Sequence, residues 1–425
     1  MLKTARILLC AVVLLTILPW PALGQPPQGA SATDPSLDPA AATEAYLARM
    51  TPEQRERSDS YFEGDYWLQL WGFLYGLGVA WIFLGTGLSA RLRDLAERIT
   101  RFRPLQVLLY AAGFIVVSAL LTLPLDLYTG YFREHKYGLS NQSFPAWFRE
   151  ELIGLALAVV LGGLALVGLY AVLRRAPRTW WIWGAVVSIL FLAIGVLIAP
   201  VFIDPLFNTY TELRQEPLRG SILSLARANG IETEKVYVVD ASKQTDRISA
   251  NVSGLLGTMR IALNDNLLRR ASPGAVQAVM GHEMGHYVLN HIYELLLSLG
   301  LVILVGFAFL RWAFDRALGR WGARWGVRGV SDPAGLPLFI ALFSIYFFVM
   351  TPVTNTIIRS NEAEADIFGL NASRQPDGFA EAALLLGEYR KMSPGPVEEW
   401  IFFDHPSGRN RILMAMRWKA EHPGQ

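Results

Sequence analysis

Residues 276–314 read VQAVMGHEMGHYVLNHIYELLLSLGLVILVGFAFLRWAF. The first part of this stretch contains His282, Glu283 and His286, and the rest is apolar over a length that can cross a bilayer. Two histidines four residues apart on a helix lie about 40° apart around its axis, so both imidazoles can bind one ion. The stretch therefore predicts a metal site next to a membrane-spanning helix.

The composition is typical of a membrane protein. Of the 425 residues, 52% are hydrophobic and only 17% are charged, whereas a soluble domain carries about 25% charged residues. The net charge is +2 and no basic tract occurs, so we expect no nucleic-acid partner. The one cysteine, Cys10, excludes a disulfide or a cysteine metal site within one chain. Any metal must be held by nitrogen and oxygen ligands.

The N-terminus, residues 1–24, has the pattern of a secretory signal peptide. Lys3 and Arg6 precede an apolar core over 8–18, and Ala22-Leu23-Gly24 forms a small-residue cleavage site. An uncleaved first membrane helix is the alternative. Residues 25–59 are rich in proline, alanine, serine and charge, and they predict a flexible linker.

Six later segments are apolar over bilayer-spanning length. They run approximately over 66–88, 105–127, 152–173, 180–203, 292–314 and 336–356. The first four place an N-terminal transmembrane bundle in residues 60–203. The region 204–425 carries the histidine motif and the last two spans.

The stretch before the histidine motif predicts a small folded unit outside the membrane. A helix over 218–228 ends at Gly230, and a buried strand covers 236–239. A glycine-broken hairpin is expected over 251–264. Ser272-Pro273 then provides an N-cap and a proline at the first helical position, which opens the helix of His282 and His286.

The His-Glu-x-x-His pattern is the signature of zinc proteases. Zinc catalysis needs three protein ligands and one open position, and His282 and His286 supply two of the ligands. Glu283 is the predicted general base, which takes a proton from the water that the ion activates. We expect one Zn²⁺ per chain. The competing interpretation is a pair of helix histidines whose hydrogen bonds are satisfied within the protein.

The third ligand must come from another part of the chain. His291 lies about 140° around the helix from His286 and is predicted to face away. Ile292 stands where metzincins have their third histidine. Glu362 is the predicted ligand, and Asp366, on the same helical face, can accept a hydrogen bond from a ligating histidine. Glu364 is the rival ligand.

Two further sites are expected around the metal. His405 and Arg411 could stabilise the oxyanion of a tetrahedral intermediate, although a histidine before a proline is also a common turn residue. The first strand of the hairpin, from Asn251 to Gly254, could offer an edge strand to an extended substrate. Asn251 and Gly254 are the substrate-binding residues that we expect there. An ordinary turn asparagine is the alternative interpretation of Asn251.

With these residues assembled, the chain resembles the type I CAAX prenyl protease family, the a-factor-converting membrane zinc endopeptidases. The resemblance covers roughly residues 60–418 and rests on motifs that occur in the family's order. These are the loop 133–142, Ile198-Ala199-Pro200, Pro205-Leu206-Phe207, Asn251, the histidine motif, Glu362 with Asp366, His405-Pro406 and Arg411-Ile412. Val252-Ser253 replaces the family's Ala-Tyr, and Ile358 stands in place of a serine.

The resemblance implies a mainly α-helical fold. In this fold a polytopic helical chamber in the membrane carries a gluzincin-like zinc metallopeptidase domain with a small β-hairpin or sheet. It also implies an integral-membrane zinc metalloendopeptidase. An HtpX-type quality-control endopeptidase is the rival of the same class. A non-hydrolytic membrane chamber that binds lipid or peptide is the rival of another class, and it would have no need of Glu283.

The expected partners are a lipid bilayer and a peptide or protein substrate that is membrane-associated or lipidated, since the family's substrates are prenylated. The arginines cluster in the loops 91–103, 174–178 and 311–328, which fall on one side if six helices cross. The positive-inside rule places that side in the cytoplasm. We therefore expect the catalytic region on the periplasmic face of a bacterial inner membrane, with the cytoplasmic face, as in eukaryotic relatives, as the alternative.

Overall fold

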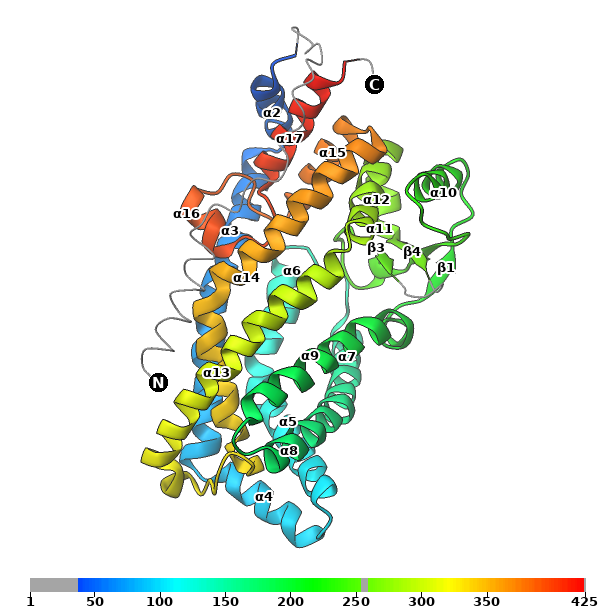
Figure 1. Cartoon of the computed structure of the whole chain (residues 1–425). Coiled ribbons are helices and arrows are strands. Elements are labelled where there is room, and N and C mark those ends of the chain that lie inside the picture. Colours follow the sequence, from blue (N-terminus) through cyan, green and yellow to red (C-terminus); the bar gives the residue numbers. More distant parts are fainter. Residues whose placement is uncertain (1–36, 254–258, 424–425) are drawn as a thin grey trace.

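A computed structural model describes residues 37–253 and 259–423 (Figure 1). Long helices dominate these residues, and one small sheet lies beside them, as predicted. The expected signal peptide over 1–24 and the expected substrate-binding residue Gly254 lie outside the described residues.

Within the described residues, six helical stretches are long and apolar enough to cross a membrane, which confirms the six predicted spans. They run over Pro52–Gly85, Arg103–Lys136, Phe144–Arg175, Trp180–Leu206, His291–Trp325 and Pro333–Ser373. Their elements are α3 (Pro52–Gly85), α5 (Arg103–Asp126), η1 (Leu127–Arg133), α6 (Glu134–Lys136), α7 (Phe144–Leu157), η2 (Ala158–Gly162), α8 (Gly163–Arg175), α9 (Trp180–Ile198), η3 (Ala199–Ile203), η4 (Asp204–Leu206), α13 (His291–Trp325), η6 (Pro333–Gly335) and α14 (Leu336–Ser373).

The helices α13 and α14 form the spine of the bundle. They pack against each other along their length, with α9 on α13 and α3 on α14 (Figure 1). An aromatic core joins them, in which the rings of Phe314 and Phe339 stack at 4.3 Å and Trp180 meets Phe339 edge-on. Both helices also reach the helix that contains His282 and His286: α13 begins just after that helix ends, and α14 packs against it.

The three arginine-rich loops meet at one end of the bundle, as predicted. Arg328 forms ion pairs with Asp94 and Glu97, two residues of α4 (Leu88–Ile99). Arg311 donates a hydrogen bond to the carbonyl of Arg178. This end, marked by α4 in Figure 1, is opposite the end that holds α12 and α15.

The flexible linker predicted over 25–59 is wrong for residues 39–59. Helix α2 (Pro39–Leu47) and the first turns of α3 occupy them. Each helix starts with proline after a capping residue: Asp38 caps α2, and Thr51 forms a capping box with Gln54 in α3. Composition alone cannot separate such helix starts from a linker, because prolines and small polar residues are common to both.

The sheet has four strands in the order β1-β2-β4-β3. The strands are β1 (Tyr210–Glu212), β2 (Val236–Val239), β3 (Ala250–Ser253) and β4 (Arg260–Asn264). The predicted strand over 236–239 and the two strands of the predicted hairpin are confirmed: β3 and β4 are antiparallel, and β2 pairs with β4 in parallel. Strand β3 therefore lies at an edge of the sheet. The turn of the hairpin, residues 254–258, lies outside the described residues. The connecting elements are η5 (Ala241–Lys243), α10 (Leu218–Ala228), as predicted, and α11 (Asp265–Arg270).

Helix α12 (Pro273–Val288) lies between the sheet and the helices that follow it in sequence. It contacts β3, α14 and α15 (Pro376–Leu386), and α15 packs against α17 (Gly408–Glu421) after the short α16 (Pro396–Phe402). The crossing of α12 and α14 is very close. A Cβ atom on Gly369 would lie 2.7 Å from the backbone nitrogen of His282, and one on Gly281 would lie 2.9 Å from the carbonyl oxygen of Gly369. These glycines let the two helices bring their polar side chains together.

Candidate active site

The three predicted ligands meet where α12 crosses α14. The side chain of Ser272 accepts a hydrogen bond from Ala275 and starts α12, as predicted, so His282 and His286 lie on one face of a regular helix. Their Nε2 atoms are 3.1 Å apart. The carboxylate oxygens of Glu362 lie 3.2 Å from Nε2 of His282 and 3.5 Å from Nε2 of His286.

The spacing of these atoms fits one zinc ion. Ligand atoms that lie 2.0–2.1 Å from a tetrahedral ion are about 3.3 Å apart. The observed separations run from 3.1 to 3.5 Å. In addition, Oε2 of Glu362 is buried without a well-formed hydrogen bond among the described residues. Two imidazoles and a carboxylate are a common donor set for catalytic zinc, so these residues could hold it.

Asp366 lies behind His282, at the position predicted for it. Its Oδ1 is 2.8 Å from Nδ1 of His282 and also accepts a hydrogen bond from Arg411. Burial disfavours the charged form of His282, but the interactions with Asp366 and Glu362 overcome it and raise the pKa of His282 to about 9. A carboxylate at Nδ1 leaves Nε2 as the nitrogen that faces the ion.

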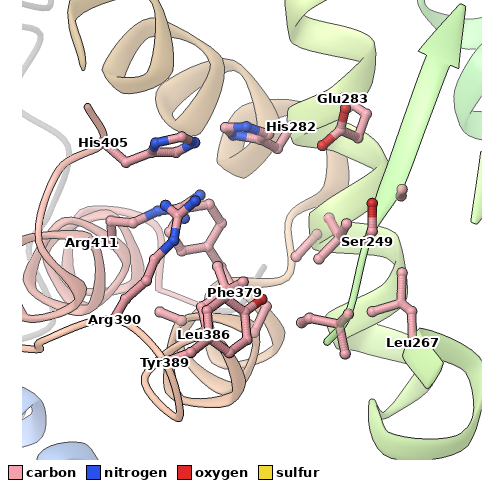
Figure 2. Close-up of a pocket in the computed structure, with 16 residues that line it drawn as sticks. Ser249, Leu267, His282, Glu283, Phe379, Leu386, Tyr389, Arg390, His405 and Arg411 are labelled. Carbon is pink, nitrogen blue, oxygen red and sulfur yellow. The ribbon is translucent and has the colours of Figure 1, made fainter. Parts of the chain in front are cut away.

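Glu283 faces a pocket on the side of α12 next to the sheet (Figure 2). Enclosure by the surrounding protein raises the pKa of Glu283 to about 7, and the nearby His282 opposes this shift. A carboxylate with such a pKa can both accept and return a proton near neutral pH.

His405 and Arg411 both reach the pocket, but they make different contacts. Nε2 of His405 lies 3.1 Å from Oε2 of Glu362, and its Nδ1 lies 2.7 Å from Asp404. Figure 2 shows the His405 ring opposite His282, and Oε2 of Glu362 lies between the two rings. The guanidinium of Arg411 instead forms a buried ion pair with Asp366.

The pocket extends from His282 and His405 to the sheet edge and has a cavity volume of about 250 Å³. Ser249 and Ala250, at the start of β3, line it. Asn251 follows on the same edge strand and pairs with Ala262 of β4. The sequence analysis missed the rest of the lining, which comes mostly from α15 and the turn after it: Phe379, Ala382, Ala383, Leu386, Tyr389 and Arg390. These residues carry no motif, and only the fold brings them to the metal ligands.

The prediction that His291 faces away from the metal ligands is wrong. Helix α12 ends at Val288, and Asn290 adopts a left-handed conformation with φ of 61° before α13 starts at His291. The break turns the chain, so Nδ1 of His291 lies 2.9 Å from Nδ1 of His286. The angular argument assumed one continuous helix. After glycine, asparagine is the residue that most readily adopts the left-handed conformation. Asn290 was therefore the signal in the sequence that the helix could end here.

The comparisons with known proteins agree with this geometry. Residues 39–209 match a family described as "CAAX prenyl protease N-terminal, five membrane helices". Residues 212–419 match peptidase family M48. The two regions follow one another along almost the whole described chain. The chain belongs to peptidase family M48.

Relatives of this M48 member include proteins from bacteria and eukaryotes. It is 29% identical to the "Uncharacterized metalloprotease YhfN" of Bacillus subtilis over 81% of this chain and 82% of that protein. It is also 29% identical to CAAX prenyl protease 1 of Saccharomyces cerevisiae, over 58% of this chain and 56% of that protein. The crystal structure of S. mikatae Ste24p shares the fold, with a TM-score of 0.73 at 23% identity, over 89% of this chain and 95% of that one.

The family and the six spans establish the broad predictions. The M48 member is a metalloprotease and a multi-pass membrane protein, so a peptide substrate and a lipid bilayer are its partners. Membership of this family also implies a metal ion.

Proposed function

We propose that this M48 member binds one zinc ion per chain through His282, His286 and Glu362 and hydrolyses internal peptide bonds. The observation that carries the proposal is the convergence of these three side chains at ligand spacing, with Glu283 beside them in an open pocket. When bound, zinc supplies a Lewis acid that polarises the peptide carbonyl and activates water.

The other residues of the site have distinct roles in this proposal. Glu283 takes a proton from the attacking water and passes it to the leaving amine. His405 stabilises the oxyanion, since its Nε2 lies 3.1 Å from Oε2 of the proposed ligand Glu362 and its side chain lines the pocket. Arg411 acts indirectly, because its guanidinium holds Asp366, which orients His282.

We propose that the substrate binds as an extended strand along β3. This strand is at the edge of the sheet, and its first residues line the pocket. An edge strand can pair with the backbone of a peptide, and Asn251 can add a side-chain hydrogen bond. The phenylalanine, leucine and tyrosine from the α15 region favour an apolar substrate side chain. A membrane-associated or lipidated protein is the proposed substrate class, as the names of the CAAX relatives suggest.

The proposed location is the inner membrane of a bacterium, with the catalytic end on the periplasmic side. Arginine loops gather at the opposite end of the bundle, and such loops remain in the cytoplasm under the positive-inside rule. The cytoplasmic orientation of eukaryotic relatives is the alternative.

The variant Glu283→Gln tests the proposed function. Purified full-length protein should keep its zinc, because all three ligands remain, but lose about 10²–10⁴-fold in hydrolysis of a reporter peptide, the usual contribution of a general base. Metal content and hydrolysis are measured on the same sample, with Glu232→Gln, an exposed glutamate, as the control. A zinc-loaded wild type that cleaves no peptide would favour the non-hydrolytic chamber.

A further inference from the structure

A second group of potential ligands lies next to the proposed zinc site. Nitrogen or oxygen atoms of His291, Glu294 and Glu364 all lie within 4.8 Å of one another. His291 and Glu294 occupy the first turn of α13, and Glu364 comes from α14. The two carboxylates are exposed, so a cation can enter this group from solvent.

The histidine of this group is built into the protein. His291 is only 1% exposed, and its Nε2 is buried with no hydrogen-bond partner in the described part of the chain. The atom faces Oε2 of Glu364 at 3.5 Å. Buried ring nitrogens normally have a hydrogen-bond partner or a metal. One nitrogen and two carboxylates suit Zn²⁺ or another divalent ion of the first transition row.

The two groups share one proton. Nδ1 of His286 and Nδ1 of His291 are 2.9 Å apart, and only one hydrogen fits between them. If His286 carries this hydrogen, its Nε2 is free to bind zinc, and neutral His291 must then carry its own hydrogen on Nε2. If His291 carries the shared hydrogen, its Nε2 is free for a cation, and Nε2 of neutral His286 is protonated. With both histidines neutral, either Nε2 of His286 or Nε2 of His291 is free to bind a metal ion, but not both.

We propose that His291, Glu294 and Glu364 form a second divalent-cation site that opposes metal binding at the catalytic site. A cation in this second site selects the tautomer of His286 that cannot bind zinc. Metal bound by His286 in turn places a hydrogen on Nε2 of His291, which then points at Glu364. Because coupling between two sites is reciprocal, each ion weakens the other by the same factor. When both sites are occupied, the catalytic ion lacks His286 as a ligand, so excess metal would inhibit the protease. The inference rests on the proposed role of His286 as a zinc ligand.

Calorimetric titration of Zn²⁺ into metal-free full-length protein in detergent tests the second site directly. Wild type should show two binding events, the second at least tenfold weaker. Glu294→Gln should show one event, and the control Glu232→Gln should show two. In Glu362→Gln, which lacks a catalytic ligand, the second site should bind at least tenfold more tightly than in wild type. A single event in wild type, or a second event that persists in Glu294→Gln, would overturn the site. If the second site of Glu362→Gln binds zinc as weakly as in wild type, the two sites do not oppose each other.

Hydrolysis of a reporter peptide is the second readout. Zinc in excess of one equivalent should lower the rate at least tenfold in wild type and Glu232→Gln, but not in Glu294→Gln. Equal inhibition of all three proteins would contradict the proposal. If wild type cleaves nothing at any zinc concentration, the proposed function fails, while the calorimetry still decides whether the second site exists.

Discussion

Arg411 on α17 donates a hydrogen bond to Oδ1 of Asp366 on α14, and both side chains are buried. The same oxygen lies 2.8 Å from Nδ1 of His282. The C-terminal helix is thereby connected to a proposed zinc ligand through one carboxylate. Removing one partner of a buried ion pair leaves an uncompensated charge, which is more costly than losing a surface pair.

We predict that Arg411→Ala lowers zinc affinity about 10–100-fold, the usual effect of losing a group that orients a metal ligand. Without the guanidinium, Asp366 loses its second partner and holds His282 less firmly. Zinc affinity is measured by competition with a chelator. Arg409→Ala is the matched control, because this arginine is on the same helix but forms an exposed ion pair with Glu44. Equal affinities for Arg411→Ala and wild type would show that the pair does not orient the ligand.

The two glutamates of α14 should respond differently to truncation. Glu362→Ala removes a proposed ligand and should abolish tight zinc binding at the catalytic site, whereas Glu364→Ala should retain one zinc and its activity. The side chain of Glu362 faces both histidines, while that of Glu364 is exposed and faces His291. Metal content and hydrolysis of a reporter peptide are measured on the same samples of both purified variants, because zinc at the second site supports no hydrolysis. If only Glu364→Ala loses zinc and activity, Glu364 is the third ligand in place of Glu362.

The sequence was sufficient for the parts of the site that lie within regular helices. Four-residue spacing put His282 and His286 on one face, and the same spacing put Glu362 and Asp366 on one face of α14. Both predictions hold because neither helix is interrupted between the paired residues. The six spans were predictable for a similar reason, since hydropathy over bilayer length is a property of a continuous segment.

Features that depend on a break or on distant contacts were not predictable. One residue in a left-handed conformation, Asn290, reversed the expected direction of His291. The lining from α15 meets the histidines only through tertiary packing. Helix α2 is too short to be stable alone, and its packing against α17 stabilises it. This contact cannot be predicted from the local sequence.

Helix α2 should therefore contribute to stability. Leu47 is 4% exposed and packs in a core with residues of α15 and α17. We predict that Leu47→Ala destabilises the protein by about 2–5 kcal/mol, as expected for a truncated core leucine. Thermal unfolding in detergent should show a lower Tm than for Glu56→Ala, an exposed control on α3. A Tm within error of wild type would mean that α2 is not part of the folded core.

Backbone pairing with β3 makes a prediction about substrates. In an added strand, alternate residues direct their N–H groups toward the partner strand. A peptide N-methylated at one such residue should lose about one hydrogen bond, or roughly 1 kcal/mol, and raise KM several-fold. Methylation of the next residue should change KM little. A scan of singly methylated peptides gives the pattern, and a uniform response along the peptide would argue against strand addition.

The arginine loops and the pocket lie at opposite ends of the helical bundle. Arg328 and Arg311 join three loops into one basic end of the bundle. Helices α12 and α15, which line the pocket with His282, lie at the opposite end (Figure 1). If all six candidate spans of the described residues cross the membrane, residues 37 and 423 lie on the same side. From the positive-inside rule we therefore predict that the basic end lies in the cytoplasm and the pocket lies outside it.

Reporter fusions test this orientation. Alkaline phosphatase joined after Gln425 should be active, because it folds only outside the cytoplasm, and green fluorescent protein at the same point should be dark. Fusions after Arg178, in a loop of the basic end, should give the reverse pair of results and serve as the matched control. The charge of the loops is the physical cause, so replacing Arg174, Arg175 and Arg178 with alanine should lower phosphatase activity at the C-terminus. A fluorescent, phosphatase-negative fusion after Gln425 would place the catalytic end in the cytoplasm, as in the eukaryotic relatives.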